Sequence, residues 1–412
     1  MSQQSSKAVS RRAFLGASAV SGIAMASQTQ AAGSPPPSGK QVKVGVVGGN
    51  FGTQFPWHLH PNAKVTAVCD IRPDRLDHMA TVFHCESRYK SFDEFLKHPD
   101  LDAVAVFTPV PMHAWMAVQA MRSGKHVISA VVAALNEEEL GEMLDTVKTT
   151  GLNYMMAETS YYRPEIITCR KLSEEKKFGT IFYSEAEYHH EGLIALARDE
   201  RGFPTWRYGF PPAQYCSHAT GMVIPVTGER LVEVQAIGWG DGHEILKTNQ
   251  YNNPFWNATC FFKTSGGHAA RISLCRHIAA GGTERGAFYG DRMSYIMARP
   301  EGSPDTISRI EKGGKTVLDS NGYPEGDVKV EAYQQPNHWE TLPESLRVKS
   351  GHGGSHVFLV NEFIRSIVEQ RRPVIDIYEA IAFTLPGIIA HKSALKGGEL
   401  MKIRDYGRGT PA

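Results

Sequence analysis

A glycine-rich turn near residue 50 and an acid further along have a spacing that suits the binding of phosphate and ribose groups. Residues 42–47 form an apolar, largely β-branched run, which is typical of a parallel strand covered on both faces. Asp70 ends the next apolar run, and 70 minus 48 places it 22 residues after Gly48, near the spacing of an acid that takes ribose hydroxyls. The residues expected to contact a dinucleotide here are Gly48, Asn50, Phe51, Asp70 and Arg72.

The turn departs from the G-x-G-x-x-G pattern, because Asn50 and Thr53 occupy the second and third glycine places. Asparagine tolerates left-handed backbone angles better than most residues, so a tight turn remains feasible. Arg72 either stacks on an adenine or meets a 2′-phosphate. The pattern therefore predicts NAD as the cofactor and leaves NADP open.

The spacing of the following elements predicts a doubly wound parallel sheet. Strand-like runs at 65–69, 103–107 and 126–129 alternate with helical patterns such as 114–122. This is the βαβ arrangement of a Rossmann domain, which we expect to span residues 41–160.

Residues 161–412 follow a different pattern and predict an α+β domain with a large, mostly antiparallel open sheet. Strand-like runs accumulate without intervening helices at 231–238, 255–264, 269–276 and 287–297. We expect one face of this sheet to hold helices and substrate and the other to meet a second copy of the chain. The polar segment 299–343 is expected to be a surface loop or a cover for the site.

Composition and charge exclude several classes of protein. With 42% hydrophobic and 21% charged residues, and a formal net charge of +1, the chain is neither disordered nor a polyanion binder, so we expect no nucleic-acid partner. None of the six cysteines forms a C-x-x-C pair. His352 and His356 are four residues apart but lack the acid of H-E-x-x-H, so no metal is expected and their glycine neighbours predict a close turn before a helix at 357–369.

The N-terminal segment has the features of an export signal. Arg11 and Arg12 precede a small-residue apolar run to Ala26 and a small pair at Ala31 and Ala32, as in a twin-arginine signal. We expect residues 1–40 to be this signal and a linker, with no stable membrane span after its removal. Folded export to the periplasm or exterior, where nicotinamide is not replenished, predicts a tightly bound cofactor.

Several short motifs resemble the Gfo/Idh/MocA oxidoreductase family over nearly everything from residue 41 to the end. The motifs are Thr108-Pro109 with His113, and Gly124-Lys125-His126-Val127. The resemblance implies a Rossmann domain followed by an open-sheet domain, and it places Thr108, Pro109 and His113 at the cofactor. Family members typically continue into Glu-Lys-Pro with a catalytic lysine, whereas this chain reads Ala130, Val131 and Val132. A valine cannot take a proton, so either another group acts as the base or the enzyme is inactive.

Within that family the chain is most similar to exported NAD-dependent glycosidases that also lack this lysine. The segments that carry this resemblance are Met155 to Glu158 before Tyr161-Tyr162-Arg163, Phe178-Gly179 before the strand to Glu191, Tyr215 before Ser217-His218, and Gly351 to Gly354. Such enzymes use bound NAD transiently and cleave a glycoside without net redox. The alternatives are a sugar dehydrogenase or transhydrogenase with net oxidation, and an inactive nucleotide- or sugar-binding protein.

The candidate catalytic residues are His218, Tyr188, Glu158, Tyr215 and His190. His218 matches the active-site histidine of the family and is the leading acid or base, although a satisfied histidine at a helix start would look the same. Tyr188 and His190 share one face of a strand by their period of two, either toward the sugar or half-buried in the sheet. Glu158 is expected to bind cofactor or sugar or to move a proton, unless it only pairs with Arg163.

Substrate contacts are expected from a loop rich in proline and glycine and from the segment after Glu158. The expected contacts are Trp206, Arg207 and Arg163. An indole stacks on a sugar face, and a guanidinium binds hydroxyls or an acid group. Arg276 either neutralises an anionic substrate or lies on a solvated sheet face.

Overall fold

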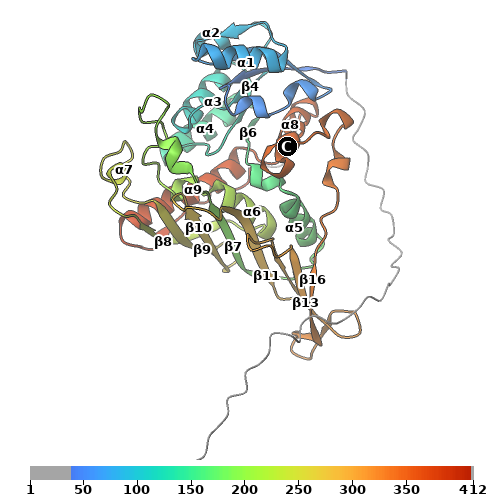
Figure 1. Cartoon of the computed structure of the whole chain (residues 1–412). Coiled ribbons are helices and arrows are strands. Elements are labelled where there is room, and N and C mark those ends of the chain that lie inside the picture. Colours follow the sequence, from blue (N-terminus) through green and yellow to red (C-terminus); the bar gives the residue numbers. More distant parts are fainter. Residues whose placement is uncertain (1–38, 410–412) are drawn as a thin grey trace, which may run out of the picture. The chain divides into compact units, whose positions relative to one another are not determined.

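A computed structural model describes residues 39–409 of the chain (Figure 1). The predicted signal lies almost entirely outside the described residues. The described residues form one compact unit, and no helix among them is long and apolar enough to cross a membrane. The unit contains two large sheets, and the boundary predicted at residue 160 stays a prediction.

The first sheet is parallel, with six strands in the order β3-β2-β1-β4-β5-β6. Its strands are β1 (Val42–Val47), β2 (Ala63–Cys69), β3 (Arg88–Tyr89), β4 (Ala103–Val106), β5 (His126–Ser129) and β6 (Tyr154–Met156). All four residues of β4 are buried, as expected where helices cover both faces of a sheet. The predicted doubly wound parallel sheet is therefore confirmed.

Four helices belong to this part of the chain. They are α1 (Pro73–Phe83), α2 (Phe92–Leu96), α3 (His113–Arg122) and α4 (Glu137–Thr150). Helix α4 begins where the side chain of Asn136 accepts a hydrogen bond from the backbone N–H of Glu139, and three glutamates fill its first turn. Between β1 and β2 the chain makes only the short 3₁₀ turns η1 (Gly52–Gln54) and η2 (Trp57–Leu59), so the glycine turn leads to no α-helix.

The second sheet has nine strands in the order β16-β13-β12-β11-β7-β10-β9-β8-β17 and is antiparallel except where β7 meets β10. The strands are β7 (Ile181–His189), β8 (Leu231–Trp239), β9 (Asn257–Thr264), β10 (Ala269–Cys275), β11 (Thr283–Gly290), β12 (Met293–Ile296), β13 (Thr306–Glu311), β16 (Asp327–Ala332) and β17 (Met401–Lys402); β14 (Val317–Leu318) and β15 (Pro324–Glu325) form a separate hairpin. The predicted mostly antiparallel open sheet is confirmed.

Two details of the predicted sheet are wrong. Residues 287–297 are not one strand, because the chain turns after Gly290 and returns as β12. The segment 299–343 is not only a loop, because β13 and β16 extend the sheet. β16 is exposed at every residue, so it lacks the buried apolar alternation by which a strand is recognised in a sequence.

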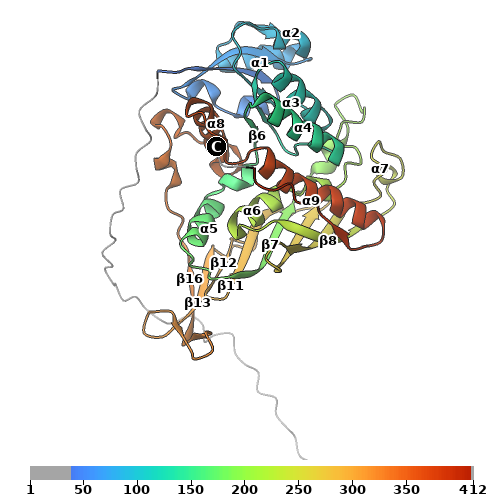
Figure 2. The same cartoon turned by 180° about the vertical axis from the view of Figure 1, so that it is seen from behind.

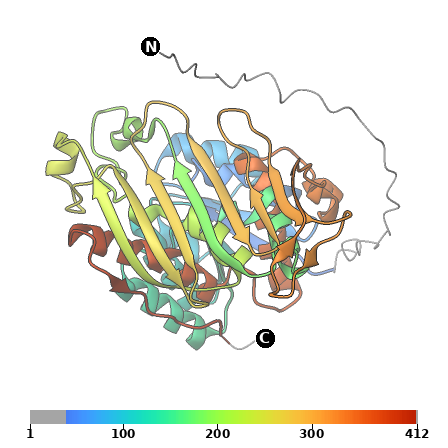
Figure 3. The same ribbon diagram turned by 90° about the horizontal axis from the view of Figure 1, so that it is seen from below.

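Helices cover one face of the second sheet. They are α5 (Pro164–Glu174), α6 (Ser217–Thr227) and α9 (Ile377–Leu395), and Figure 2 shows them lying along the sheet. Figure 3 shows the other face turned toward the viewer, with the helices behind it. We call these the covered face and the open face. The short helix α7 (Glu244–Lys247) lies beyond β8 in a loop.

Late segments of the chain return to the first sheet and join the two parts. The backbone N–H of Met156 donates to the carbonyl of Ile375 at 3.0 Å, and the amide of Asn153 donates to the carbonyl of Arg371 at 2.8 Å. Helix α8 (Gly351–Val368) begins beside the glycine turn, because Nδ1 of His356 is 3.1 Å from the carbonyl oxygen of Gln54. The region between the sheets is thus built from segments far apart in sequence.

Candidate active site

The loops that follow the parallel strands meet at one edge of the first sheet, where a Rossmann fold binds its ligand. At Gly48, φ is +96°, and a Cβ atom there would lie 2.4 Å from the carbonyl oxygen of Phe107, so only glycine fits. The carboxylate of Asp70 accepts from the backbone N–H of Gly49 at 2.6 Å and from that of Arg72 at 2.8 Å. Asp70 therefore joins the first two loops.

This edge fits a dinucleotide. At Gly48 no side chain covers the backbone at this edge, and the side chain of Asn50 is exposed at the tip of the turn. The carboxylate of Asp70 follows at the spacing of an acid that binds ribose hydroxyls. Phe51 packs beneath the turn, edge-on to Phe55 and Phe107. The exposed guanidinium of Arg72 already pairs with Asp74 and Glu200.

His113 holds two of these loops together. Its imidazole is 1% exposed, with Nε2 2.8 Å from the carbonyl oxygen of Thr108 and Nδ1 2.8 Å from that of Val132. Burial lowers the pKa of His113, and a neutral imidazole donates only one of these bonds at a time. Both ring nitrogens are occupied by the protein backbone, so His113 positions the cofactor loops. Pro109 is exposed beside it.

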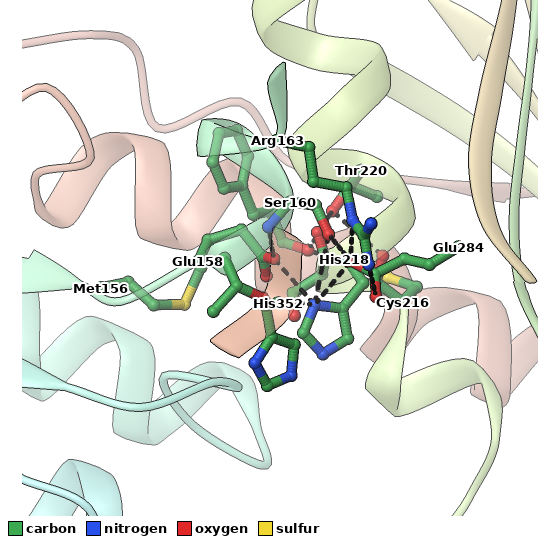
Figure 4. Close-up of polar contacts among 12 residues, drawn as sticks. Met156, Glu158, Ser160, Arg163, Cys216, His218, Thr220, Glu284 and His352 are labelled. Atoms are coloured by element: carbon green, nitrogen blue, oxygen red, sulfur yellow. Dashed lines mark hydrogen bonds and ion pairs between the residues drawn. The ribbon is translucent and has the colours of Figure 1, made fainter. Parts of the chain in front are cut away.

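A buried carboxylate and a histidine form the centre of the candidate site (Figure 4). Glu158 follows β6 and is 0% exposed, and its Oε1 is 2.8 Å from Nδ1 of His218 and accepts from the backbone N–H of Ser160 at 2.9 Å. His218 is in the first turn of α6. The close packing of this helix on Glu158 depends on Gly221, where a Cβ atom would lie 2.6 Å from Cγ of Glu158. Two of the five residues predicted to act in catalysis, Glu158 and His218, are thus brought together.

A second acid, Glu284 of β11, lies beside this pair. Its carboxylate accepts from both Nε and Nη2 of Arg163, at 2.8 and 2.5 Å, and from the hydroxyl of Ser160 at 2.5 Å. The expected alternative, in which Glu158 pairs with Arg163, is wrong because Arg163 is held by Glu284. Arg163 itself is predicted as a substrate contact, and the structure shows it committed to this ion pair.

Electrostatics act in opposite ways on the pKa values of His218 and Glu284. Burial opposes a charge on His218, but the carboxylate of Glu158, by charge and by hydrogen bond, and that of Glu284 raise the pKa of His218 overall. Burial also opposes the charge on Glu284, yet the charges of His218 and Arg163 hold the pKa of that carboxyl far below its usual range. At neutral pH, Glu284 is therefore ionised, and the two carboxylates favour the protonated form of His218.

Two tyrosines line the same centre. Tyr188 and Glu284 are cross-strand neighbours on the covered face, and the ring of Tyr188 stacks on His218 with centroids 4.7 Å apart. Tyr215 meets His218 edge-on at 5.4 Å. Burial raises the pKa of Tyr188 well above its usual value, so its hydroxyl stays protonated. His190 is exposed just beyond β7, with its ring centroid 5.8 Å from that of Tyr188.

Aromatic residues and two arginines extend the site beyond Tyr215. Trp206 and Phe210 meet edge-on at 5.3 Å, and Trp206 lies 6.3 Å from Tyr215. Arg207 lies over the Trp206 ring at 4.2 Å. Arg276 is 6% exposed, so the prediction that it could lie on a solvated sheet face is wrong.

Sequence reasoning assigned no role to Glu284 and only a structural turn to the segment of His352. Residues His352, Gly353 and Gly354 have positive φ angles of 49°, 67° and 92°, which confirms the turn. The ring of His352 is nearly parallel to that of His218 at 6.3 Å, and its Nδ1 is 2.9 Å from Nε2 of His356. The pair of histidines in the turn was the available signal. No group of three metal-ligating residues occurs within residues 39–409.

The position of the missing lysine is apolar and closed. Ala130, Val131 and Val132 are all buried, so the end of β5 supplies no titratable side chain. Because the end of β5 supplies no such group, the base for any proton transfer must come from another element. Glu158 and His218 form a buried acid–base pair next to this edge.

The six cysteines are free thiols in the structure.

Comparison with known proteins agrees with this architecture. Residues 42–158 match the family model described as an oxidoreductase family with an NAD-binding Rossmann fold, Gfo/Idh/MocA. Residues 309–411 match the model of the glycosyl hydrolase 109 C-terminal domain. The fold and site thus define an NAD-binding oxidoreductase-fold enzyme.

More particularly, the chain combines a Gfo/Idh/MocA Rossmann domain with a glycosyl hydrolase 109 C-terminal domain. It is 24% identical to glycosyl hydrolase family 109 protein 1 of a Shewanella species, covering 90% of this chain and 86% of that protein. It is 25% identical to a glycosyl hydrolase family 109 protein of Streptomyces coelicolor, covering 98% and 95%.

Solved structures share the fold. A scyllo-inositol dehydrogenase from Lactobacillus casei with bound NAD(H) and scyllo-inositol superposes with a TM-score of 0.66 at 18% identity, covering 88% of this chain and 99% of that one. A levoglucosan dehydrogenase in complex with NADH and L-sorbose gives a TM-score of 0.72 at 18% identity, covering 89% and 100%. These likenesses establish the fold and no more.

Proposed function

We propose that the protein is a glycosidase that uses tightly bound NAD transiently and cleaves a carbohydrate substrate without net redox. The observation that carries this proposal is the buried Glu158–His218 pair, with its 2.8 Å contact, at the cofactor edge of a Rossmann sheet whose usual lysine position is apolar. The names of the family 109 relatives support the same reaction class. The site supplies a base without the lysine.

The roles of the side chains follow from their contacts. Bound NAD would accept a hydride from a sugar carbon and later return it. In the tautomer in which Nδ1–H of His218 donates to Glu158, Nε2 carries a lone pair that can take a proton from a hydroxyl or from the carbon next to a carbonyl. Glu158 stabilises the resulting imidazolium. Tyr188, whose pKa burial keeps high, stays neutral and can donate a hydrogen bond to a leaving oxygen.

NAD is the cofactor that this edge fits best. Asp70 would repel a 2′-phosphate, and the guanidinium of Arg72 is engaged by Asp74 and Glu200. Because exposed ion pairs are weak, about 0–1 kcal/mol each, NADP would require only that Arg72 exchange partners. A dinucleotide that is exported with the protein must be retained, which is consistent with a reaction that regenerates it.

The proposed location is the periplasm or exterior, by the twin-arginine route. This part of the proposal rests on Arg11 and Arg12 and the apolar run that follows them in the sequence. Cell fractionation of the full chain and of an Arg11→Lys/Arg12→Lys variant tests it. Only the unaltered chain should reach the exported fraction, and equal distribution of both would contradict the proposal.

The open face of the second sheet is proposed to bind a second copy of the chain. Cross-strand register places Ile237 opposite Thr259, and Phe261 opposite Gln235, on this face. Ile237 and Phe261 are 65% and 58% exposed, and Trp239 is also exposed. An apolar surface of this kind, continuous over neighbouring strands, marks an association site.

A dehydrogenase with net oxidation is the second candidate, because the similar solved structures carry dehydrogenase names. Purified protein should first be extracted with acid to identify and count the dinucleotide. The protein is then given aryl glycosides and free sugars separately. Cleavage without accumulation of NADH supports the proposed cycle, whereas stoichiometric reduction by a free sugar supports the dehydrogenase.

A further inference from the structure

The guanidinium of Arg276 is buried next to the candidate active site without an acidic partner. The residue is 6% exposed, and its Nη1 donates to the carbonyl of Phe210 at 3.3 Å. No carboxylate within residues 39–409 lies within salt-bridge distance of it. Its other neighbours are aromatic, since it lies over the ring of Phe210 at 5.1 Å and over that of Tyr215 at 5.4 Å.

A second guanidinium, that of Arg207, lies in the same surroundings. Arg207 lies over Trp206 and likewise has no carboxylate at salt-bridge distance among the described residues. After burial, the positive charge of Arg207 is the largest influence that lowers the pKa of Arg276, to about 10. The same Arg207 and Arg276 also influence Tyr188. The two cations therefore repel each other beside the tyrosines that line the centre.

Two other arginines with little exposure each have an acidic partner. Arg163 forms a two-point pair with Glu284, and Arg230 forms one with Glu379. Taking a charge out of water costs several kcal/mol unless it is paired, so buried arginines are usually matched in this way. Aromatic rings compensate only in part, by about 2 kcal/mol when desolvated. Arg276 therefore differs from these arginines, because no acid of the described residues compensates its charge.

We propose that Arg276, with Arg207, binds an anionic oxygen group of the substrate, a carboxylate or a sulfate ester, and so makes the enzyme selective for acidic sugars. The proposal deepens the proposed function and rests on it for the reaction. The guanidinium fork matches such oxyanions with two parallel hydrogen bonds. Trp206 would stack on the sugar ring while the anion enters between the two arginines.

The test compares matched substrates that differ in one group. Aryl hexosides, the corresponding aryl hexuronides and 6-sulfated aryl hexosides are given to the holoenzyme, and kcat/KM is measured for each. We expect at least one of the two anionic series to exceed its neutral counterpart by about 10- to 100-fold, as a charge-assisted bidentate pair supplies. A preference for the carboxylate over the sulfate, or the reverse, identifies the group.

Two variants assign the preference. Arg276→Met should remove most of the preference for the anionic substrate, measured as the ratio of kcat/KM for the anionic and the neutral substrate. Arg207→Met, at a half-buried position less critical for folding, should lower this ratio in the same direction. Arg201→Met, an exposed arginine that pairs with Asp199 in the same loop, is the control and should change neither. The thermal midpoint and the dinucleotide content of each variant show whether it is folded.

The outcomes separate this inference from the proposed function. If neutral glycosides are cleaved best and the variants lose activity equally on charged and neutral substrates, the inference is overturned and the proposed function survives. Binding of free hexuronate is measured in parallel by calorimetry on the holoenzyme. If hexuronate binds and Arg276→Met abolishes this binding, but no glycoside is cleaved, the proposed function fails and the anion site stands.

Discussion

Nδ1 of His218 lies 2.8 Å from Oε1 of Glu158, and both side chains are buried at the point where the first sheet meets helix α6. The contact joins residues 60 positions apart in the sequence. It fixes which ring nitrogen of His218 faces the carboxylate and leaves the other for a substrate. The proposed reaction depends on this relationship.

Glu158→Gln is therefore expected to reduce kcat by about 100-fold or more, the scale of a general base contribution. The pH profile separates this effect from a loss of structure. Glu158 raises the pKa of His218, so removing its charge lowers that pKa, and the acidic limb of the kcat/KM profile should move to lower pH. Glu175→Gln, an exposed carboxylate at the end of α5, is the control. An unchanged acidic limb in Glu158→Gln would contradict the assignment.

The glycine turn gives a prediction about the cofactor. Gly48→Ala should reduce NAD content to a small fraction and destabilise the protein by about 1–3 kcal/mol, because φ is +96° and the added methyl would meet the carbonyl of Phe107. Dinucleotide extraction and chemical unfolding measure both effects. Gly141→Ala, inside α4 with no atom near its Cβ position, should instead stabilise by about 0.5–1 kcal/mol. Full retention of NAD in Gly48→Ala would contradict the placement of the cofactor.

Acid should destabilise the fold through buried histidines, of which His391 is the simplest. Its Nδ1 has no partner among the described residues, and burial lowers its pKa to about 4. Because the folded-state pKa is lowered, the contribution of His391 to stability is complete above the unfolded value of about 6.5 and is lost as pH falls toward 4. Between pH 7 and pH 4.5, the free energy of unfolding of His391→Leu should therefore fall by about 2–3 kcal/mol less than that of the unaltered protein.

The measurement for His391 is the free energy of unfolding at pH 7 and pH 4.5 for the unaltered protein and for His391→Leu. His78→Leu, at an exposed position of α1, provides the control. The difference between the two pH values should shrink in His391→Leu and stay the same in His78→Leu. An equal pH dependence in all three proteins would show that His391 does not titrate in this window.

We expect copies of the chain to associate into an oligomer through the open face of the second sheet. Ile237→Glu combined with Phe261→Glu places two charges on that face, and a buried unpaired charge costs enough to dissociate an interface. Size-exclusion chromatography with light scattering should give a smaller molar mass for this double variant than for the unaltered protein. Phe203→Glu, at another exposed aromatic, should leave the mass unchanged. A monomeric unaltered chain would contradict the proposed interface.

The sequence predicted most reliably the elements whose residues are buried on every side. Ala103–Val106 is a continuous apolar run, and Val42–Val47 is apolar except for the half-buried Lys43; such runs at βαβ spacing permit few topologies. Asp327–Ala332 was missed because each of its residues is exposed. A strand of this kind is defined by its hydrogen bonds to β13, which leave no periodic apolar signal.

The candidate site was predicted in part. His218 and Glu158 were found by resemblance, but their contact, and the role of Glu284, depend on a fold that brings residues together across long stretches of chain. Arg163 and Glu284, 121 positions apart, are a clear example. Arg276 could not be placed from its spacing, because a strand end is compatible with either a solvated or a buried side chain.

The central claim, transient oxidation of the sugar by the protein's own NAD, is tested most directly by isotope exchange. The holoenzyme, with no added cofactor, is incubated with a cleaved aryl glycoside in D₂O, and the released sugar is examined by mass spectrometry and NMR. Our account predicts one carbon-bound deuterium, next to the transiently oxidised carbon, in every product molecule, and no accumulation of NADH. A released sugar without carbon-bound deuterium would mean direct hydrolysis and would contradict it.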